Sequence, residues 1–183
     1  DMLSPEQVYQ SSANALSVLD GVYRMLTKTG WGSSWAHENA GYSAYTLVFD
    51  LYGEDHVMDN QGSGWFYYDY AFNTWGDYTS TAGHQYQIWN FFYKVINNTN
   101  NVLAHTFTDD EETANSVLGQ AYALRALSYM WLVQSYCQPG PDFPGVPSYT
   151  EPTTPESEGK GRGKVQDVYN QVNSDMNKAI EYI

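Results

Sequence analysis

Two long stretches of helical periodicity, separated by a very short connection, constrain this chain more than any other feature. From about His84 to Ala104 and again from Asp110 to Tyr136, apolar residues recur at the spacing of one helix face. A connection of only a few residues, which includes 107–109, lies between the two, so the pair should form an antiparallel hairpin. The later turns of the second stretch are apolar all round, which predicts that it is the central, most buried helix.

Further helices are predicted on both sides of this hairpin. A start signal at Ser4 leads into a helix that reaches about Leu26, a short apolar helix covers 43–51, and an amphipathic helix runs from about Lys164 to the end. Six prolines between residues 139 and 155 predict an extended crossing. The expected fold class is all-α, with tetratricopeptide-like paired helices (an α-α superhelix) and long irregular loops.

The stretch from Glu54 to Ala82 has no helical period and contains a dense run of aromatic residues between Trp65 and Tyr78. Sugars stack their C–H faces on aromatic rings, and their hydroxyls bond to amides and carboxylates. The competing interpretation is that these rings cover the helical core beneath a long loop. The predicted glycan-binding residues are Trp65, Tyr68, Asn73, Trp75, Asp77 and Tyr78, and Trp31 and Trp35 are a second choice.

Charge, hydropathy and cysteine content exclude several classes of protein. The formal net charge of -13 would repel phosphate backbones and anionic lipid headgroups, so nucleic acid is not an expected partner. The chain has no apolar run of the roughly 18 residues that a membrane span needs. The single cysteine, Cys137, has no basic neighbour in sequence, which predicts a buried or turn thiol rather than a nucleophile.

The titratable residues do not form a catalytic or metal-binding pattern. The acidic group of Asp50, Glu54, Asp55 and Asp59 lacks calcium-loop spacing and predicts a solvated face. The four histidines, His37, His56, His84 and His105, lie too far apart in sequence for a metal-binding pair. We therefore expect no catalytic residue, no metal and no cofactor. Arg125, within the apolar central helix, should form an ion pair with a carboxylate of a neighbouring helix.

The predicted central helix contains the run GQAYALRALSY at 119–129, followed by LVQSY at 132–136. These motifs resemble the central helix of the SusD/RagB family of Bacteroidetes outer-membrane nutrient-binding lipoproteins. The run GVPSY at 145–149 resembles the family's G-V-P-L-Y crossing, and Val168-Tyr169 with Asp175 resembles the helix that follows. The chain departs from the pattern at Tyr136-Cys137, where the family has Tyr-Gly, and it carries no lipidated N-terminal cysteine.

The resemblance implies a cell-surface lipoprotein of the outer membrane that captures oligosaccharides or polysaccharides without transforming them. Its implied partner is a SusC-like TonB-dependent transporter, with membrane attachment only through an N-terminal lipid anchor absent from this chain. Members of the family are longer, so residues 1–183 are interpreted as an N-terminal SusD-like helical domain, a fragment of a longer protein. The matched motifs are scaffold positions, and no ligand contact is carried over from them.

Two other functions remain open from the sequence. The first is a helical-repeat module that binds a peptide or protein partner in a groove. The second is a hydrolase whose acidic residues lie outside this chain.

Overall fold

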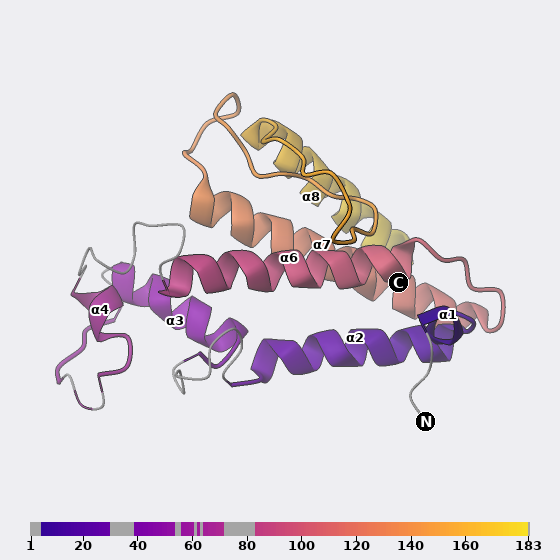
Figure 1. Ribbon diagram of the computed structural model, residues 1–183, viewed down its shortest axis with the longest axis horizontal. Coiled ribbons are helices and arrows are strands. Elements are labelled where there is room, and N and C mark those ends of the chain that lie inside the picture. The colour runs from indigo at the N-terminus through magenta and orange to yellow at the C-terminus, as the bar shows by residue number, and fades with distance from the viewer. Residues whose placement is uncertain are drawn as a thin grey trace. The chain divides into compact units, whose positions relative to one another are not determined.

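The computed structural model describes residues 5–29, 39–53, 56–60, 62, 64–71 and 83–182. Within these ranges the regular elements are helices (Figure 1). A β-bridge joins Pro144 to Lys164. The prediction of an all-α fold is confirmed. The helices are α1 (Pro5–Val8), α2 (Ser12–Thr27), α3 (Tyr42–Tyr52), α4 (Tyr67–Tyr70), α6 (Gly83–Leu103), α7 (Glu111–Tyr136) and α8 (Val165–Glu181).

The chain divides into two compact units whose boundaries fall inside α2 and α6. The first unit comprises Asp1–Val22 together with Phe92–Ile183, and the second comprises Tyr23–Phe91. None of the helices among the described residues is both long enough and apolar enough to cross a membrane.

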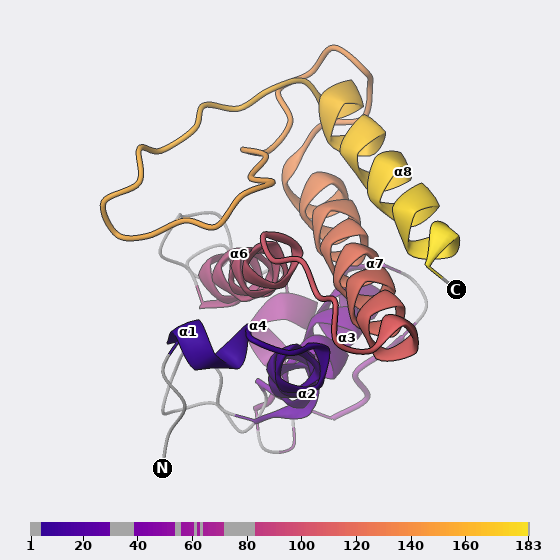
Figure 2. The same cartoon turned by 90° about the vertical axis from the view of Figure 1, so that its right-hand side faces the viewer.

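In the first unit α7 is the central helix, as predicted, and α8 packs along it (Figure 2). Tyr129 and Leu132 are fully buried, and the Phe92 ring of α6 stacks on Trp131 with centroids 5.8 Å apart. Gly119 permits the close approach of α8, because a Cβ there would lie only 3.2 Å from the Cβ of Tyr182. The extended crossing after α7 is also confirmed, since residues 137–164 contain no helix.

Buried polar side chains hold this crossing against α6 and α7. The Tyr129 hydroxyl accepts from the Tyr149 amide at 2.6 Å and donates to the Tyr149 carbonyl at 2.8 Å. Asn100 donates to the carbonyls of Tyr149 and Glu151, each at 3.0 Å. Because the crossing has few backbone partners of its own, these side chains supply the hydrogen bonds that its buried groups require.

The predicted ion pair of Arg125 is present, and its partner is Asp175 of α8. Arg125 Nε donates to Asp175 Oδ2 at 2.8 Å and Nη2 donates to Oδ1 at 2.6 Å, while Nη1 donates to Asn100 Oδ1 at 2.8 Å. Both charged side chains are buried. The planar guanidinium donates its hydrogen bonds only along set directions. Because its partners lie on α6 and α8, these bonds fix how α6, α7 and α8 pack together.

A continuous helix from Ser4 to about Leu26 is wrong, because the helix is interrupted between Val8 and Ser12. The Ser11 hydroxyl accepts from the Asn14 amide at 3.2 Å and so caps the start of α2. Asp109, which precedes α7, accepts from the Ser12 amide at 3.0 Å and from its hydroxyl at 2.9 Å. These side-chain acceptors replace helical hydrogen bonds at the break, an alternative that serine and aspartate provide.

In the second unit, α3 lies close to its predicted range and packs through Tyr45, whose ring forms a T-shaped pair with Phe91, with centroids 5.2 Å apart. The turn that leads into α3 requires glycine. Gly41 has a φ of 61°, and a Cβ there would overlap the backbone carbonyl of Leu26.

Candidate functional site

We call the ring-dense run between Trp65 and Tyr78 the aromatic segment. Residues 64–71 cover its described beginning and include both an exposed ring and a buried ring. Trp65 is 47% exposed, whereas the neighbouring Phe66 is buried. Phe66 has left-handed backbone angles, φ 55° and ψ 11°, and immediately precedes α4, a short helix within a stretch predicted to be irregular. Such angles are uncommon for a bulky residue, and they persist where surrounding contacts hold them.

A buried cluster of polar side chains supports α4 in this unit. His84, at the start of α6, places Nδ1 2.8 Å from Asp69 Oδ1 and Nε2 3.1 Å from Asn39 Oδ1. The Tyr52 hydroxyl donates to the same Asp69 oxygen at 3.2 Å. Asn39, Asp69 and His84 are exposed by 1%, 2% and 8%, and the Phe66 ring stacks on the imidazole at 5.8 Å. We call Asn39, Asp69 and His84 the histidine cluster.

Sequence reasoning did not identify the histidine cluster. It treated His84 as one of four widely spaced histidines and found no metal-binding partner for it. Asp69 and Asn39 lie 15 and 45 residues away along the chain, so no local spacing marks them as its neighbours. The only local signal is that Asp69 lies within the ring-dense run from Trp65 to Tyr78 and that His84 follows this run.

The predicted ligand-binding residues are only partly described by the structure. Trp65 is accessible, as a stacking platform must be. Tyr68 belongs to α4, and its side chain is outside the described atoms. The remaining predicted residues, Asn73, Trp75, Asp77 and Tyr78, and the second-choice Trp31 and Trp35, lie outside the described residues.

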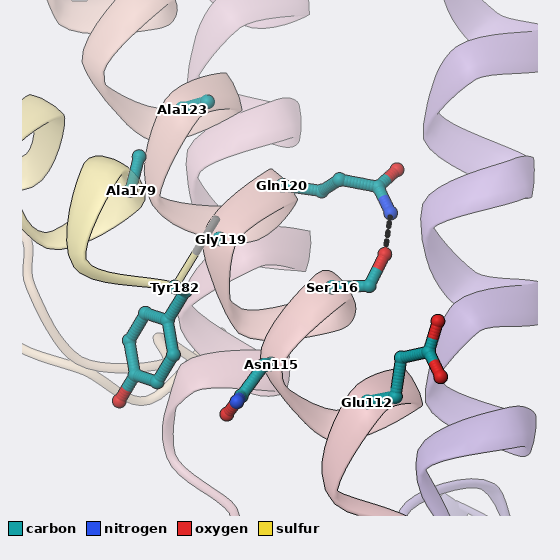
Figure 3. A pocket seen from close by; sticks show the side chains of 8 residues that line it. All are labelled: Glu112, Asn115, Ser116, Gly119, Gln120, Ala123, Ala179 and Tyr182. Carbon is teal, nitrogen blue, oxygen red and sulfur yellow. Dashed lines mark hydrogen bonds between the residues drawn. The ribbon is translucent and has the colours of Figure 1, made fainter.

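A separate hollow lies in the first unit, between α7 and the end of α8 (Figure 3). It has a volume of about 450 Å³, and its lining residues are Glu112, Asn115, Ser116, Gly119, Gln120, Ala123, Ala179 and Tyr182. Gln120 donates to Ser116 at 3.0 Å. In Figure 3 the side chains of Glu112, Ser116 and Gln120 project from one side of α7, whereas Asn115 and Tyr182 extend to another. The polar groups do not converge on one point, which distinguishes this shallow surface from a catalytic centre.

The described members of the acidic group, Asp50 and Asp59, are at least partly exposed to solvent. Asp50 and His56 approach to 3.8 Å, with side chains 46% and 57% exposed, which agrees with a solvated acidic face. No group of three or more His, Cys, Asp or Glu side chains among the described residues could hold a metal ion. Glu54 and Asp55 lie outside these residues.

Cys137 has a basic neighbour that the local sequence did not reveal. Arg162 Nη2 lies 3.9 Å from its sulfur, although the two residues are 25 positions apart. Burial raises the pKa of the Cys137 thiol, and the nearby guanidinium offsets only part of that shift. A raised pKa disfavours the reactive thiolate, and the expectation that Cys137 is not a nucleophile stays a prediction.

Residues 4–183 match the SusD-like family described as "Starch-binding associating with outer membrane". The chain belongs to the SusD-like family. The resemblance inferred from residues 119–136 is thereby confirmed, and the paired α7 and α8 agree with the helical architecture of this family.

Relatives of this SusD-like chain are known in sequence and in structure. It is 24% identical over 185 residues to SusD-like protein P2 of Formosa agariphila, an alignment that covers 100% of this chain and 33% of that protein. A SusD-like carbohydrate binding protein from Bacteroides vulgatus superposes with a TM-score of 0.75 at 26% identity, over 96% of this chain and 36% of that one.

A SusD superfamily protein from Bacteroides fragilis has the same fold, with a TM-score of 0.67 at 24% identity, over 93% of this chain and 39% of that one. This SusD-like chain thus spans about a third of the length of the relatives that it matches.

Proposed function

We propose that this chain is part of a non-catalytic, cell-surface protein that binds oligosaccharides or polysaccharides. The observation that carries the proposal is the family match across residues 4–183, to a family described by starch binding and outer-membrane association. The Bacteroides vulgatus neighbour, described as a carbohydrate binding protein, supports the same class of ligand.

The chemistry of the aromatic segment supports recognition by ring stacking. Trp65 presents an accessible indole at the start of the segment. Tyr68, Trp75 and Tyr78 would extend this platform, and Asn73 and Asp77 would bond to sugar hydroxyls. Stacking on rings needs no metal and no cofactor, and binding without turnover needs no catalytic residue.

We further propose that the protein is an outer-membrane lipoprotein on the extracellular face and delivers its ligand to a SusC-like TonB-dependent transporter. Support comes from the family's description as associating with the outer membrane. Attachment would require only a lipid anchor outside these 183 residues, and residues 1–183 would form the N-terminal helical domain of the protein. Co-purification of the transporter with a tagged full-length protein from its native membrane tests this delivery role.

Affinity electrophoresis and calorimetry of the full-length protein against starch and a panel of plant and host polysaccharides test glycan binding. We expect retention by at least one polysaccharide and reduced retention for Trp65→Ala. Tyr86→Ala is the matched control, because Tyr86 is an exposed aromatic residue outside the segment. Oligosaccharide products in a thin-layer assay of the same mixtures would contradict binding without catalysis.

A second candidate function is capture of a peptide or protein segment, and the hollow between α7 and α8 favours it. Its mixture of small side chains, amides and a carboxylate suits an extended or helical segment laid along α7. A glycan array without hits, beside a peptide pull-down that Ala123→Phe abolishes, would establish this alternative. Retention by polysaccharide with no effect of Ala123→Phe would exclude it.

A further inference from the structure

In the first unit, α7 and α8 lie side by side as an antiparallel pair. Arg125 of α7 bonds to Asp175 of α8, and Gly119, earlier in α7, lies against Ala179 and Tyr182 at the end of α8. The buried residues of α8 form one face of the helix, and they are Val165, Val168, Val172, Asp175 and Ala179. The contact with α7 accounts for this face.

A second apolar row of α8 is open to solvent. Tyr169, Met176 and Ile180 recur at helical spacing, and their side chains are 36%, 44% and 65% exposed. A helix that packs against a single neighbour carries polar side chains outside that contact. In α8, by contrast, two adjoining faces are apolar, and only the first of them is buried.

α7 contributes a matching row beside the hollow. Ala123 lines the hollow, Leu127 is partly exposed one turn further along, and Met130 is 36% exposed. Ser116 and Gln120, which project from one side of α7 in Figure 3, extend this row towards the start of the helix, where it becomes polar.

Helical geometry places the two rows on the same side of the pair. On each helix the row lies about a quarter turn from the contact with the other helix, in the same rotational sense along the chain, and the two helices run in opposite directions. We call this side the open face, and its apolar members are Ala123, Leu127, Met130, Tyr169, Met176 and Ile180.

The open face has the form that receives another helix. Side chains in rows on two neighbouring helices leave a groove between them, into which the ridge of a third helix packs. In stacked helical-repeat proteins each pair covers the apolar face of its neighbour, and a pair that caps the stack has a polar outer face instead. Because Met130, Met176 and Ile180 lie on the open face, α7 and α8 have the character of a pair inside a stack.

The relatives contain further chain that could cover the open face. The matched part is 33% of SusD-like protein P2 and 36% of the Bacteroides vulgatus protein, so most of each relative lies outside it. We propose that the helical pair that follows α8 in the full-length protein packs on the open face, and that one of its helices fills the hollow between α7 and α8. This proposal does not rest on glycan binding. It competes with the second candidate function, because a filled hollow has no room for a segment of another protein.

Two methionines of the open face report whether it is covered. Hydroxyl-radical footprinting of the full-length protein, read by mass spectrometry, measures the oxidation of Met130 and Met176. We expect both to oxidise about tenfold or more slowly in the native protein than in urea. Tyr86, 52% exposed in the other unit, is the control and should react at comparable rates in both states. Rapid oxidation of both methionines in the native protein would overturn the proposal.

The same measurement at several protein concentrations identifies what covers the open face. Protection that is independent of concentration is the expected result. Protection that is lost on dilution would assign the face to a second copy of the chain, and protection that appears only with an added peptide would assign it to the second candidate function. Either of these results would overturn the proposal.

A charge placed on the open face provides a second readout. Met176→Lys would bury an unpaired ammonium group beneath the added helix, so we expect it to lower the melting temperature of the full-length protein. Ser174→Lys is the matched control, because Ser174 is exposed on a different side of α8, and it should leave the melting temperature unchanged. Equal melting temperatures of the two variants would contradict the proposal. If Met176→Lys does not fold, the footprint of the wild-type protein provides the test.

Discussion

The two units of the chain each contain a buried polar cluster, and the two clusters have different compositions and different tasks. In the first unit Arg125 bonds to Asp175 and Asn100 and joins three helices through a guanidinium that is charged at every relevant pH. In the second unit His84, at the start of α6, bonds to Asp69 of α4 and to Asn39. The first cluster joins three helices, and the second joins the start of α6 to α4 and to Asn39.

The two clusters differ in whether the local sequence shows that a polar side chain is buried and needs a partner. An arginine within an apolar helix is conspicuous, because an unpaired buried guanidinium is too costly to retain, so a partner could be predicted. A histidine at the start of a helix is compatible with many surroundings and predicts none of them.

Removal of one partner from the arginine cluster should have the largest effect. Arg125→Met leaves the Asp175 carboxylate buried and unpaired, and we expect a loss of about 3–5 kcal/mol in the free energy of unfolding. Urea denaturation measures it. Lys178→Met is the control, since the Lys178 and Glu181 pair, 2.8 Å apart, is about half exposed and should contribute little. Equal effects of the two substitutions would remove the distinction between buried and exposed pairs.

The turn beside the histidine cluster should be the next most sensitive position. Gly41→Ala forces a Cβ against the Leu26 carbonyl at a positive φ, and we expect a loss of about 1–3 kcal/mol in stability. Gly21→Ala is a control with the opposite sign. A Cβ at Gly21 of α2 meets nothing within 4 Å, so helix propensity should stabilise that variant by up to about 1 kcal/mol. Thermal denaturation of both variants compares them, and a stable Gly41→Ala would show that the turn tolerates a side chain.

A substitution in the aromatic segment should change glycan affinity but not stability, whereas Arg125→Met in the first unit should change stability. We expect Trp75→Ala to weaken glycan binding about tenfold while the melting temperature changes little. Calorimetry and differential scanning of the same preparation measure the two effects. A large thermal loss with binding intact would assign that ring to the core and move the recognition surface elsewhere.

The smallest effect concerns pH and the break between α1 and α2. Partial desolvation opposes the shift, but the hydrogen bonds from Ser12 lower the pKa of Asp109 below its ordinary value. Because the folded pKa is the lower one, this stabilisation is complete above the ordinary aspartate range and is lost as pH falls through the lowered value. Melting temperatures from neutral pH down to about pH 3 should show this acid dependence reduced in Asp109→Asn. Asp20→Asn, an exposed residue of α2, is the control and should leave it unchanged.

Local pattern predicted the helices well where a long periodic face exists. The starts and ends of α6, α7 and α8 lie within a residue or two of their predicted positions, and the Asp110 cap accepts from the Thr113 amide at 2.9 Å. Hydrophobic periodicity was less informative about helix boundaries in the interrupted first helix and in α4. At those places a side chain from elsewhere in the chain, Asp109 in one case and His84 in the other, determines the backbone.

The candidate site, too, could be predicted only in part from the sequence. The sequence identified the ring-dense segment, and the structure establishes the exposure of Trp65. The assignment of Tyr68, Asn73, Trp75, Asp77 and Tyr78 to glycan contacts stays a prediction. Residue chemistry could propose stacking, but no local pattern distinguishes a ring that meets a ligand from one that covers a core.

By itself the sequence determined the all-helical class, the proline-held crossing and the need for a partner to Arg125. These follow from periodicity and from the cost of burying charge, which act over a few residues. Tertiary structure alone decided that Asp109 bonds to Ser12 and that His84 meets Asp69 and Asn39, contacts across 97, 15 and 45 residues. Such pairings depend on how the whole chain folds, because no short-range spacing brings these atoms together.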